Sequence, residues 1–265
     1  MHDVFFSLPT PALVMVIVIS VFGAAAGGWL LGRRLRSQPT AHHEPAGVVH
    51  GAVLGLVGLL LAFGLSMAVG RYDARRALLV HEANDLSTTY LRAQLLAEPE
   101  RSESLELLER YAVEATRFAQ QVPDTASFND ADRKLAALQD DLWAAAGRSV
   151  DTDPVGTAPR LYTESLNDLI DRHTDRTASL RNRIPGAVLT LQLLAGALAV
   201  GALALYLTLL GRGLAASLVA AGLVVVILFV TFDLDRPERG FIKVPAAPLQ
   251  DVVTDIQEGP AFERP

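Results

Sequence analysis

The sequence of 265 residues contains no cysteine. This absence excludes disulfides, thiolate zinc sites and cysteine nucleophiles, although it leaves the cellular compartment open. Lysine is almost absent too, because Lys134 and Lys243 are the only lysines among 23 basic residues. The 29 acidic residues outnumber the basic ones and give a net charge of −6. Since nucleic-acid binding needs a basic face, this balance disfavours a nucleic-acid partner.

Signatures of catalysis are missing as well. The sequence has no glycine-rich phosphate loop, no nucleophile elbow and no zinc motif, so it predicts neither an enzyme nor a bound cofactor. The strict alternation that is typical of β-strands is absent outside the apolar runs. The sequence therefore predicts an all-α protein.

Four long apolar runs dominate what is present, and 51% of the residues are hydrophobic. Each run exceeds the roughly 18 residues that indicate a membrane-spanning helix. The predicted spans are residues 11–32, 46–70, 184–211 and 213–232. Small residues at 24–26 resemble a signal-peptide cleavage site, but no basic residue precedes this run and three arginines follow it. We therefore expect an uncleaved first helix.

A charged segment, residues 71–183, separates the two pairs of spans and carries 15 basic and 20 acidic residues. The second span is expected to continue into this segment as one helix to about Ala97, because neither glycine nor proline interrupts the helical spacing of its apolar residues. Three further helices are predicted in this segment. The first ends before Pro123, the second covers residues 129–147, and the third begins at about Arg160 and carries His173 on its apolar face.

Two stretches are predicted to lack regular structure. Residues 150–159 have the composition of a loop, and residues 233–265 are expected to form an extended C-terminal tail because of their prolines. The four amphipathic helices of the charged segment need apolar partners, which they find in each other or in identical neighbouring chains.

The basic residues near the span ends predict the orientation in the membrane. With four spans, the charged segment and both termini share one side. Ten arginines and lysines flank the spans on that side, against four on the other. This sum places the charged segment and both termini in the cytoplasm, although the arginines at 33–36 beside the first span favour the opposite orientation.

The second span has two distinct faces. Bulky apolar residues form one stripe and small residues form the other; the bulky ones are Leu56, Leu59, Phe63 and Met67, and the small ones are Gly51, Gly55, Gly58, Ala62 and Ser66. A bulky stripe around a central axis makes a hydrophobic constriction that gates by dewetting, whereas the simpler alternative is a stripe that faces lipid. Small residues let helices approach closely.

Further small residues spaced four apart are candidates for close helix contacts in the bilayer. These pairs are Gly23 with Gly27, Gly28 with Gly32, Gly51 with Gly55, and Ala197 with Gly201. No charged residue lies at the predicted mid-membrane depth, which argues against a transporter or proton relay. His50, near a span end, is expected to be a structural, wetted histidine.

Arg71, Arg183 and Arg236 each lie at the end of a predicted span. Such side chains are expected to extend to the membrane interface. If several copies of the chain surrounded one axis, rings of these arginines would also attract inorganic anions.

Three groups of residues are weak candidates for metal binding. His42, His43 and Glu44 are adjacent in a loop, where a solvated role is the simpler interpretation. Asp168, Asp171, His173 and Asp175 crowd one helix, and a solvated face is again simpler. Asp233, Asp235 and Glu238 are weak calcium candidates, because calcium takes several oxygen ligands, but pairing with Arg236 and Arg239 is the alternative we favour.

Three blocks of sequence resemble the bacterial bestrophin-like membrane protein family. The first runs from Leu60 to Arg76 with Glu82 and Asn84 beyond it, the second is Asp171-x-His173-x-x-Arg176 leading to Pro185, and the third runs from Asp233 to Ile242. The resemblance implies a bestrophin-like fold of four spans with a helical cytoplasmic insert between the second and third. It also implies a homo-oligomeric ring in the lipid bilayer of the bacterial inner membrane, around an anion (chloride) channel lined by the second span.

The same resemblance identifies Leu59, Phe63 and Ser66 as pore-lining candidates. Bestrophins narrow the pore with three bulky apolar residues one helical turn apart, and Phe63 matches the last of them. Leu59 is a smaller replacement and Gly55 lacks a side chain, so a tight gate is not implied. The long acidic run that binds calcium in animal bestrophins is also missing. The alternative to a channel is a non-conducting membrane scaffold or sensor, whose helical cytoplasmic domain binds a protein partner.

Overall fold

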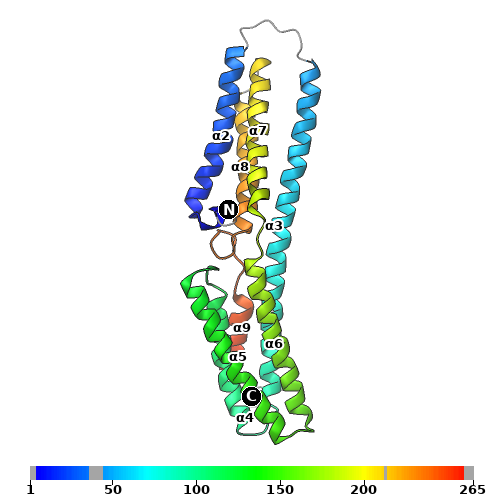
Figure 1. Cartoon of the computed structure of the whole chain (residues 1–265), viewed down its shortest axis with the longest axis vertical. Coiled ribbons are helices and arrows are strands. Elements are labelled where there is room, and N and C mark those ends of the chain that lie inside the picture. Colours follow the sequence, from blue (N-terminus) through cyan, green and yellow to red (C-terminus); the bar gives the residue numbers. More distant parts are fainter. Residues whose placement is uncertain (1–3, 36–43, 212–213, 260–265) are drawn as a thin grey trace. The chain divides into compact units, whose positions relative to one another are not determined.

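The structure is a computed structural model that describes residues 4–35, 44–211 and 214–259. Helices and their connecting turns make up this described part of the chain, without a strand. The helices, shown in Figure 1, are α1 (Val4–Ser7), α2 (Thr10–Leu35), α3 (Glu44–Ala93), α4 (Glu100–Phe118), α5 (Ala126–Thr152), α6 (Thr157–Arg181), α7 (Gly186–Leu209), α8 (Leu214–Leu234) and α9 (Ala247–Gln257).

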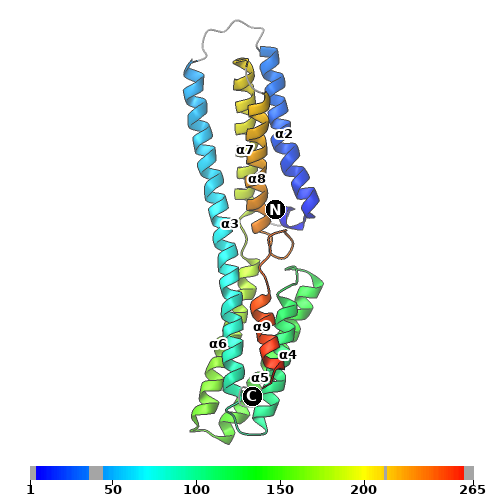
Figure 2. The same ribbon diagram turned by 180° about the vertical axis from the view of Figure 1, so that it is seen from behind.

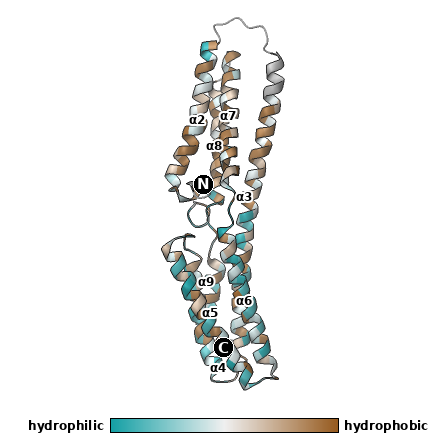
Figure 3. Cartoon of the chain, viewed as in Figure 1, coloured by the Kyte–Doolittle hydropathy of each residue, from teal (hydrophilic) through white to brown (hydrophobic). Residues whose placement is uncertain are grey.

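The chain divides into two compact units. The membrane unit comprises residues 1–72 and 183–242, and the helical unit comprises residues 73–182 and 243–265. Four described stretches contain a helix that is long and apolar enough to cross a membrane, namely Thr10–Leu35, Gly51–Ala93, Thr157–Leu209 and Leu214–Leu234. Their apolar parts are the brown portions of α2, α3, α7 and α8 in Figure 3. The predicted fold of four spans with a helical insert is confirmed.

The membrane unit is built around α2, α7 and α8. On α2, the buried residues Leu13, Ile17, Val21 and Ala25 recur every four positions and form one stripe. Glycine allows a close contact between α2 and α7, because a Cβ at Gly28 would overlap the Gly201 carbonyl of α7. Figures 1 and 2 show, from opposite sides, that the apolar part of α3 runs beside this bundle.

The helical unit has its own core. Aromatic and leucine side chains from α4, α5 and α6 fill it, including Tyr111, Phe118, Phe128, Leu135, Leu142, Tyr162 and Leu166. The N-terminus of α5 is capped by Thr125, whose hydroxyl accepts a hydrogen bond from the Phe128 backbone N–H. The last part of α3 contributes Leu79, Leu86 and Tyr90 to the same core.

Hydrogen bonds connect α6 to the last part of α3 at several levels. Arg75 donates to the Asn182 carbonyl at 2.9 Å, the Thr89 hydroxyl to the Ser165 carbonyl at 3.0 Å, and Arg92 to the Leu161 carbonyl at 2.8 Å. These bonds align α6 with α3 and bring the polar side chains of both helices into register.

Two sequence predictions about unstructured segments were wrong. The expected loop at 150–159 shrinks to four residues, because α5 continues to Thr152 and Pro159 lies in the first turn of α6, where proline is tolerated. The expected extended tail contains α9, which begins at a proline-bearing first turn. The buried residues Leu249, Val252 and Ile256 of α9 recur at helical spacing and pack with α4 in the core.

Candidate functional site

Leu59, Phe63 and Ser66 share a face of α3 that the other described residues leave uncovered. The exposed fraction is 52% for Leu59 and 61% for Phe63, and Ser66 is exposed as well. Leu61 and Ala68, at 5% and 0%, lie on the opposite side of the helix. One side of α3 therefore packs in the membrane unit, and the other is bare.

The small residues of the spans fall into two groups. A Cβ at Gly28, Gly32 or Gly201 would collide with a neighbouring helix, so these residues permit a close contact, which the structure places between α2 and α7. A Cβ at Gly23, Gly27, Gly51 or Gly55 would meet nothing within 4 Å. For this second group, helix contact stays a prediction that concerns other copies of the chain.

The segment that follows α8 is organised by two buried carboxylates. Asp233 accepts hydrogen bonds from the backbone N–H groups of Phe241 and Ile242 at 3.0 and 2.8 Å. Asp235 accepts from the Ile184 N–H, just before α7, at 2.8 and 3.0 Å. These two weak calcium candidates thus act as caps for backbone amides. Among the described residues, no three His, Asp or Glu side chains are grouped to hold a metal ion.

Arginines of the same segment bind the chain next to the first span. Arg236 donates to the Leu8 carbonyl, and Arg239 donates to the carbonyls of Phe6 and Ser7 at 3.0 and 2.8 Å. The guanidinium of Arg183 lies 3.4 Å from the centre of the Phe6 ring. Arg236 is 2% exposed, so the chain itself surrounds its side chain; a location at the membrane interface stays a prediction.

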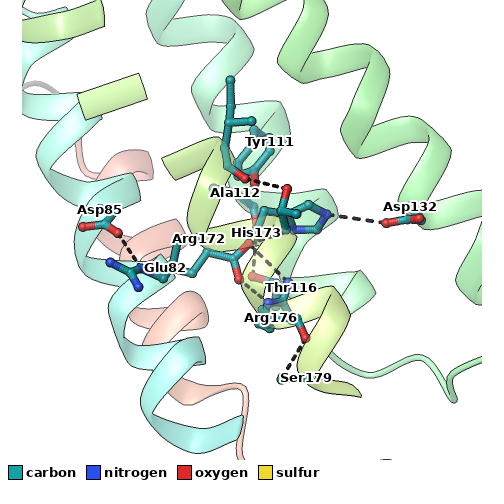
Figure 4. Close-up of polar contacts among 12 residues, drawn as sticks. Glu82, Asp85, Tyr111, Ala112, Thr116, Asp132, Arg172, His173, Arg176 and Ser179 are labelled. Carbon is teal, nitrogen blue, oxygen red and sulfur yellow. Dashed lines mark hydrogen bonds and ion pairs between the residues drawn. The ribbon is translucent and has the colours of Figure 1, made fainter. Parts of the chain in front are cut away.

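The helical unit contains a buried cluster of charged side chains, which Figure 4 shows between α3, α5 and α6. Glu82 is fully buried and forms an ion pair with Arg176, which is 3% exposed. The His173 Nδ1 lies 3.0 Å from Glu82 Oε1, and its Nε2 lies 3.6 Å from Asp132 Oδ1. With His173 protonated, two negative and two positive groups alternate through the cluster. Buried charges of this kind require such pairing.

A model of the bestrophin-like domain matches residues 18–249 of this sequence, which is most of the chain. The chain belongs to the bestrophin-like family. Its fold is similar to that of a bacterial bestrophin homologue from Klebsiella pneumoniae, solved as several point variants. One variant gives a TM-score of 0.67 at 11% identity, covering 92% of this chain and 98% of that chain.

A second Klebsiella pneumoniae variant gives a TM-score of 0.65 at 13% identity, with 95% of this chain and 98% of that chain covered. At such identities the likeness concerns the fold alone. No curated protein sequence matches this bestrophin-like protein.

Mutual pairing sets the protonation states in the buried cluster of the bestrophin-like protein. Burial alone would raise the pKa of Glu82, but the Arg176 charge and the His173 hydrogen bond outweigh it and lower that pKa. Burial alone would lower the pKa of His173, but hydrogen bonds to Asp132 and Glu82 outweigh it and raise that pKa. The hydrogen bond from His173 lowers the pKa of Asp132. The cluster therefore favours a protonated histidine between two carboxylates.

The raised pKa of His173 predicts a loss of stability at alkaline pH. The histidine of the unfolded chain titrates near pH 6.5. The stability that protonated His173 contributes to the folded protein is therefore fully present below that pH, and it is lost as the pH rises through the higher pKa of the folded state. We expect the melting temperature of the wild type to fall more steeply between pH 6.5 and 9 than that of His173→Gln, which cannot titrate. Parallel curves in a thermal-unfolding series would contradict this prediction.

Sequence reasoning located only part of these sites. Asp168, Asp171 and Asp175 are exposed, as expected for a solvated face, whereas His173 on the same helix is buried. The pairing of His173 with Glu82 was missed; the only signal was that both residues occur in the blocks that resemble the family. His42 and His43 lie outside the described residues, as do the side chains of Glu44 and His50. Arg71 is half-buried.

Proposed function

We propose that this bestrophin-like protein is a homo-oligomeric anion channel of the bacterial inner membrane, with a pore lined by α3. The bare face of α3 carries the proposal. Leu59 and Phe63 lie one turn apart on that face, and symmetric copies around an axis would turn them into stacked apolar rings. Such rings gate ion flow by dewetting.

The small residues of α3 and the basic residues at the span ends also agree with this proposal. A Cβ at Gly51, Gly55 or Gly58 would meet none of the described residues of other helices within 4 Å, and small residues are suited to contacts between helices in lipid. The excess of basic residues at the span ends on the side of the helical unit supports a cytoplasmic location for that unit and for both termini. Arg71 and Arg183 are then candidates for attracting chloride at the cytoplasmic end.

Chloride flux into liposomes tests the proposal. Phe63→Ala is expected to widen the apolar constriction and raise the basal flux well above that of the wild type, because a wider apolar pore stays wet. Leu198→Ala is the matched control, since Leu198 is an apolar residue of α7 that is 71% exposed, and it should leave the flux unchanged. Folded oligomers that never conduct, as wild type or as Phe63→Ala, would favour a membrane scaffold instead.

A further inference from the structure

Gln192 is a polar side chain inside the membrane unit. It lies on α7, one of the proposed spans, and is 1% exposed. Its Nε2 donates a hydrogen bond of 3.1 Å to the backbone carbonyl of Leu60 on α3. A hydrogen bond between two spans holds them in one arrangement, because lipid offers no competing donor or acceptor.

The surface of α3 is shaped to receive this amide. Gly64 lies one helical turn after Leu60, and a Cβ at Gly64 would overlap the Gln192 amide group. A glycine in a helix interior destabilises the helix relative to alanine. Here the missing side chain lets the amide reach the backbone of α3.

The carbonyl oxygen of the Gln192 side chain lacks a hydrogen bond in the described part of the chain. Its Oε1 is buried and has no hydrogen-bond partner among the described residues. A buried polar group without a partner destabilises a protein, and more so in a bilayer. An apolar residue of the same length would avoid that cost, so stability alone does not explain a glutamine at this position.

The bond lies at the depth of the proposed constriction. Leu60 follows Leu59 directly and precedes Phe63 by less than one turn, and both of those side chains are on the bare face. Leu61 and Gly64, on the side toward Gln192, are buried. A shift or rotation of α3 at Leu60 would therefore move the two side chains proposed to narrow the pore.

We infer that Gln192 is a positioning residue, which fixes the radial position and rotation of α3 at the level of Leu59 and Phe63. The role in a pore rests on the proposed channel function, whereas the role in holding α3 does not. The Leu60 carbonyl that accepts this bond also accepts a backbone hydrogen bond within α3. Helices bend where a side chain inserts into their backbone hydrogen bonds in this way.

The test measures the position of α3 and the flux separately. Because the chain has no cysteine, spin labels can be placed by Ile19→Cys on α2 and Leu56→Cys on α3, both of which are exposed. Labelled chains are diluted with unlabelled ones, reconstituted, and studied by pulsed EPR. Gln192→Met keeps the length of the side chain and removes the donor. Gly64→Ala keeps the donor and fills its space.

Thr208→Val is the matched control. Thr208 is also a buried polar residue of α7, but its hydroxyl donates to Ala204 of its own helix at 2.6 Å. We expect Gln192→Met and Gly64→Ala to broaden the α2–α3 distance distribution and to change chloride flux about three- to fivefold. That factor corresponds to the 0.6–1 kcal/mol that an interhelical hydrogen bond contributes, at an RT of about 0.59 kcal/mol. Thr208→Val should change neither.

Distances in Gln192→Met and Gly64→Ala that match the Thr208→Val control would overturn the positioning role. A shifted distance in chains that never conduct would support the hold on α3 while overturning the proposed channel.

Discussion

Glu82→Gln is expected to lower the free energy of unfolding of the helical unit by about 3–5 kcal/mol, the usual effect of removing one partner of a buried ion pair. The reason is that Arg176, which is 3% exposed, and the protonated His173 would lose the carboxylate they share. Arg176 would remain buried without the carboxylate that pairs with it. The Phe118 ring beneath its guanidinium, at 4.9 Å, offers only weak compensation.

The measurement is a urea titration of the detergent-solubilised protein, followed through the fluorescence of Trp143 in a Trp29→Phe background. Trp143 lies on α5 of the helical unit, so its signal reports that unit. Asp85→Asn serves as control, because Asp85 lies one turn away on α3 and pairs with Arg172 at 3.1 Å where both side chains are about one-third exposed. Such a pair contributes at most about 1 kcal/mol. Equal losses of unfolding free energy in the two variants would show that the buried cluster stabilises the helical unit no more than the partly exposed Asp85–Arg172 pair does.

Gly28→Val is expected to destabilise the membrane unit severely, by at least the roughly 1–3 kcal/mol typical of overpacking. The added side chain would meet the backbone of Gly201 on α7, and a backbone cannot rotate away as a flexible side chain can. Both helices would have to separate along this close contact, which would also loosen the contacts of their neighbours.

Gly27→Val is a matched control, since it introduces the same side chain one residue earlier on the same helix, where a Cβ meets nothing within 4 Å. The two variants share the effect of valine on helix propensity, so their difference isolates the packing. The folded fraction by size-exclusion chromatography in detergent and the melting temperature provide the comparison. A Gly28→Val protein that is as stable as Gly27→Val would refute the close α2–α7 contact.

The parts of the fold that depend on hydropathy along the chain could be predicted from the sequence. Long apolar runs fix the spans, and the absence of glycine and proline after Gly70 is enough to indicate that α3 continues beyond its apolar part. The prolines of the tail misled the prediction of α9, because Pro248 in a first helical turn starts a helix instead of interrupting one.

Pairings between distant residues could not be predicted in the same way. Helical spacing places His173 on an apolar face, but nothing local shows that Glu82, 91 residues away, meets it there. Gln192 poses the same problem, because its partner is a backbone carbonyl, which every residue possesses and no sequence pattern reveals. The place of Arg236 in the sequence, just after a span, is typical of an interfacial arginine. Only the fold shows that the carbonyls near Leu8 surround it.

The contacts of Arg236 and Arg239 with the carbonyls of Phe6, Ser7 and Leu8 determine which substitutions this attachment tolerates. Recognition through main-chain atoms does not depend on the side chains of the segment that is recognised. The main-chain attachment therefore depends on the side chains of one partner only. Substitutions at Ser7 or Leu8 would leave these carbonyls in place, whereas the Phe6 ring also lies beneath the guanidinium groups of Arg183 and Arg239. Arg236 and Arg239 are thus the side chains on which the attachment of the N-terminal segment depends.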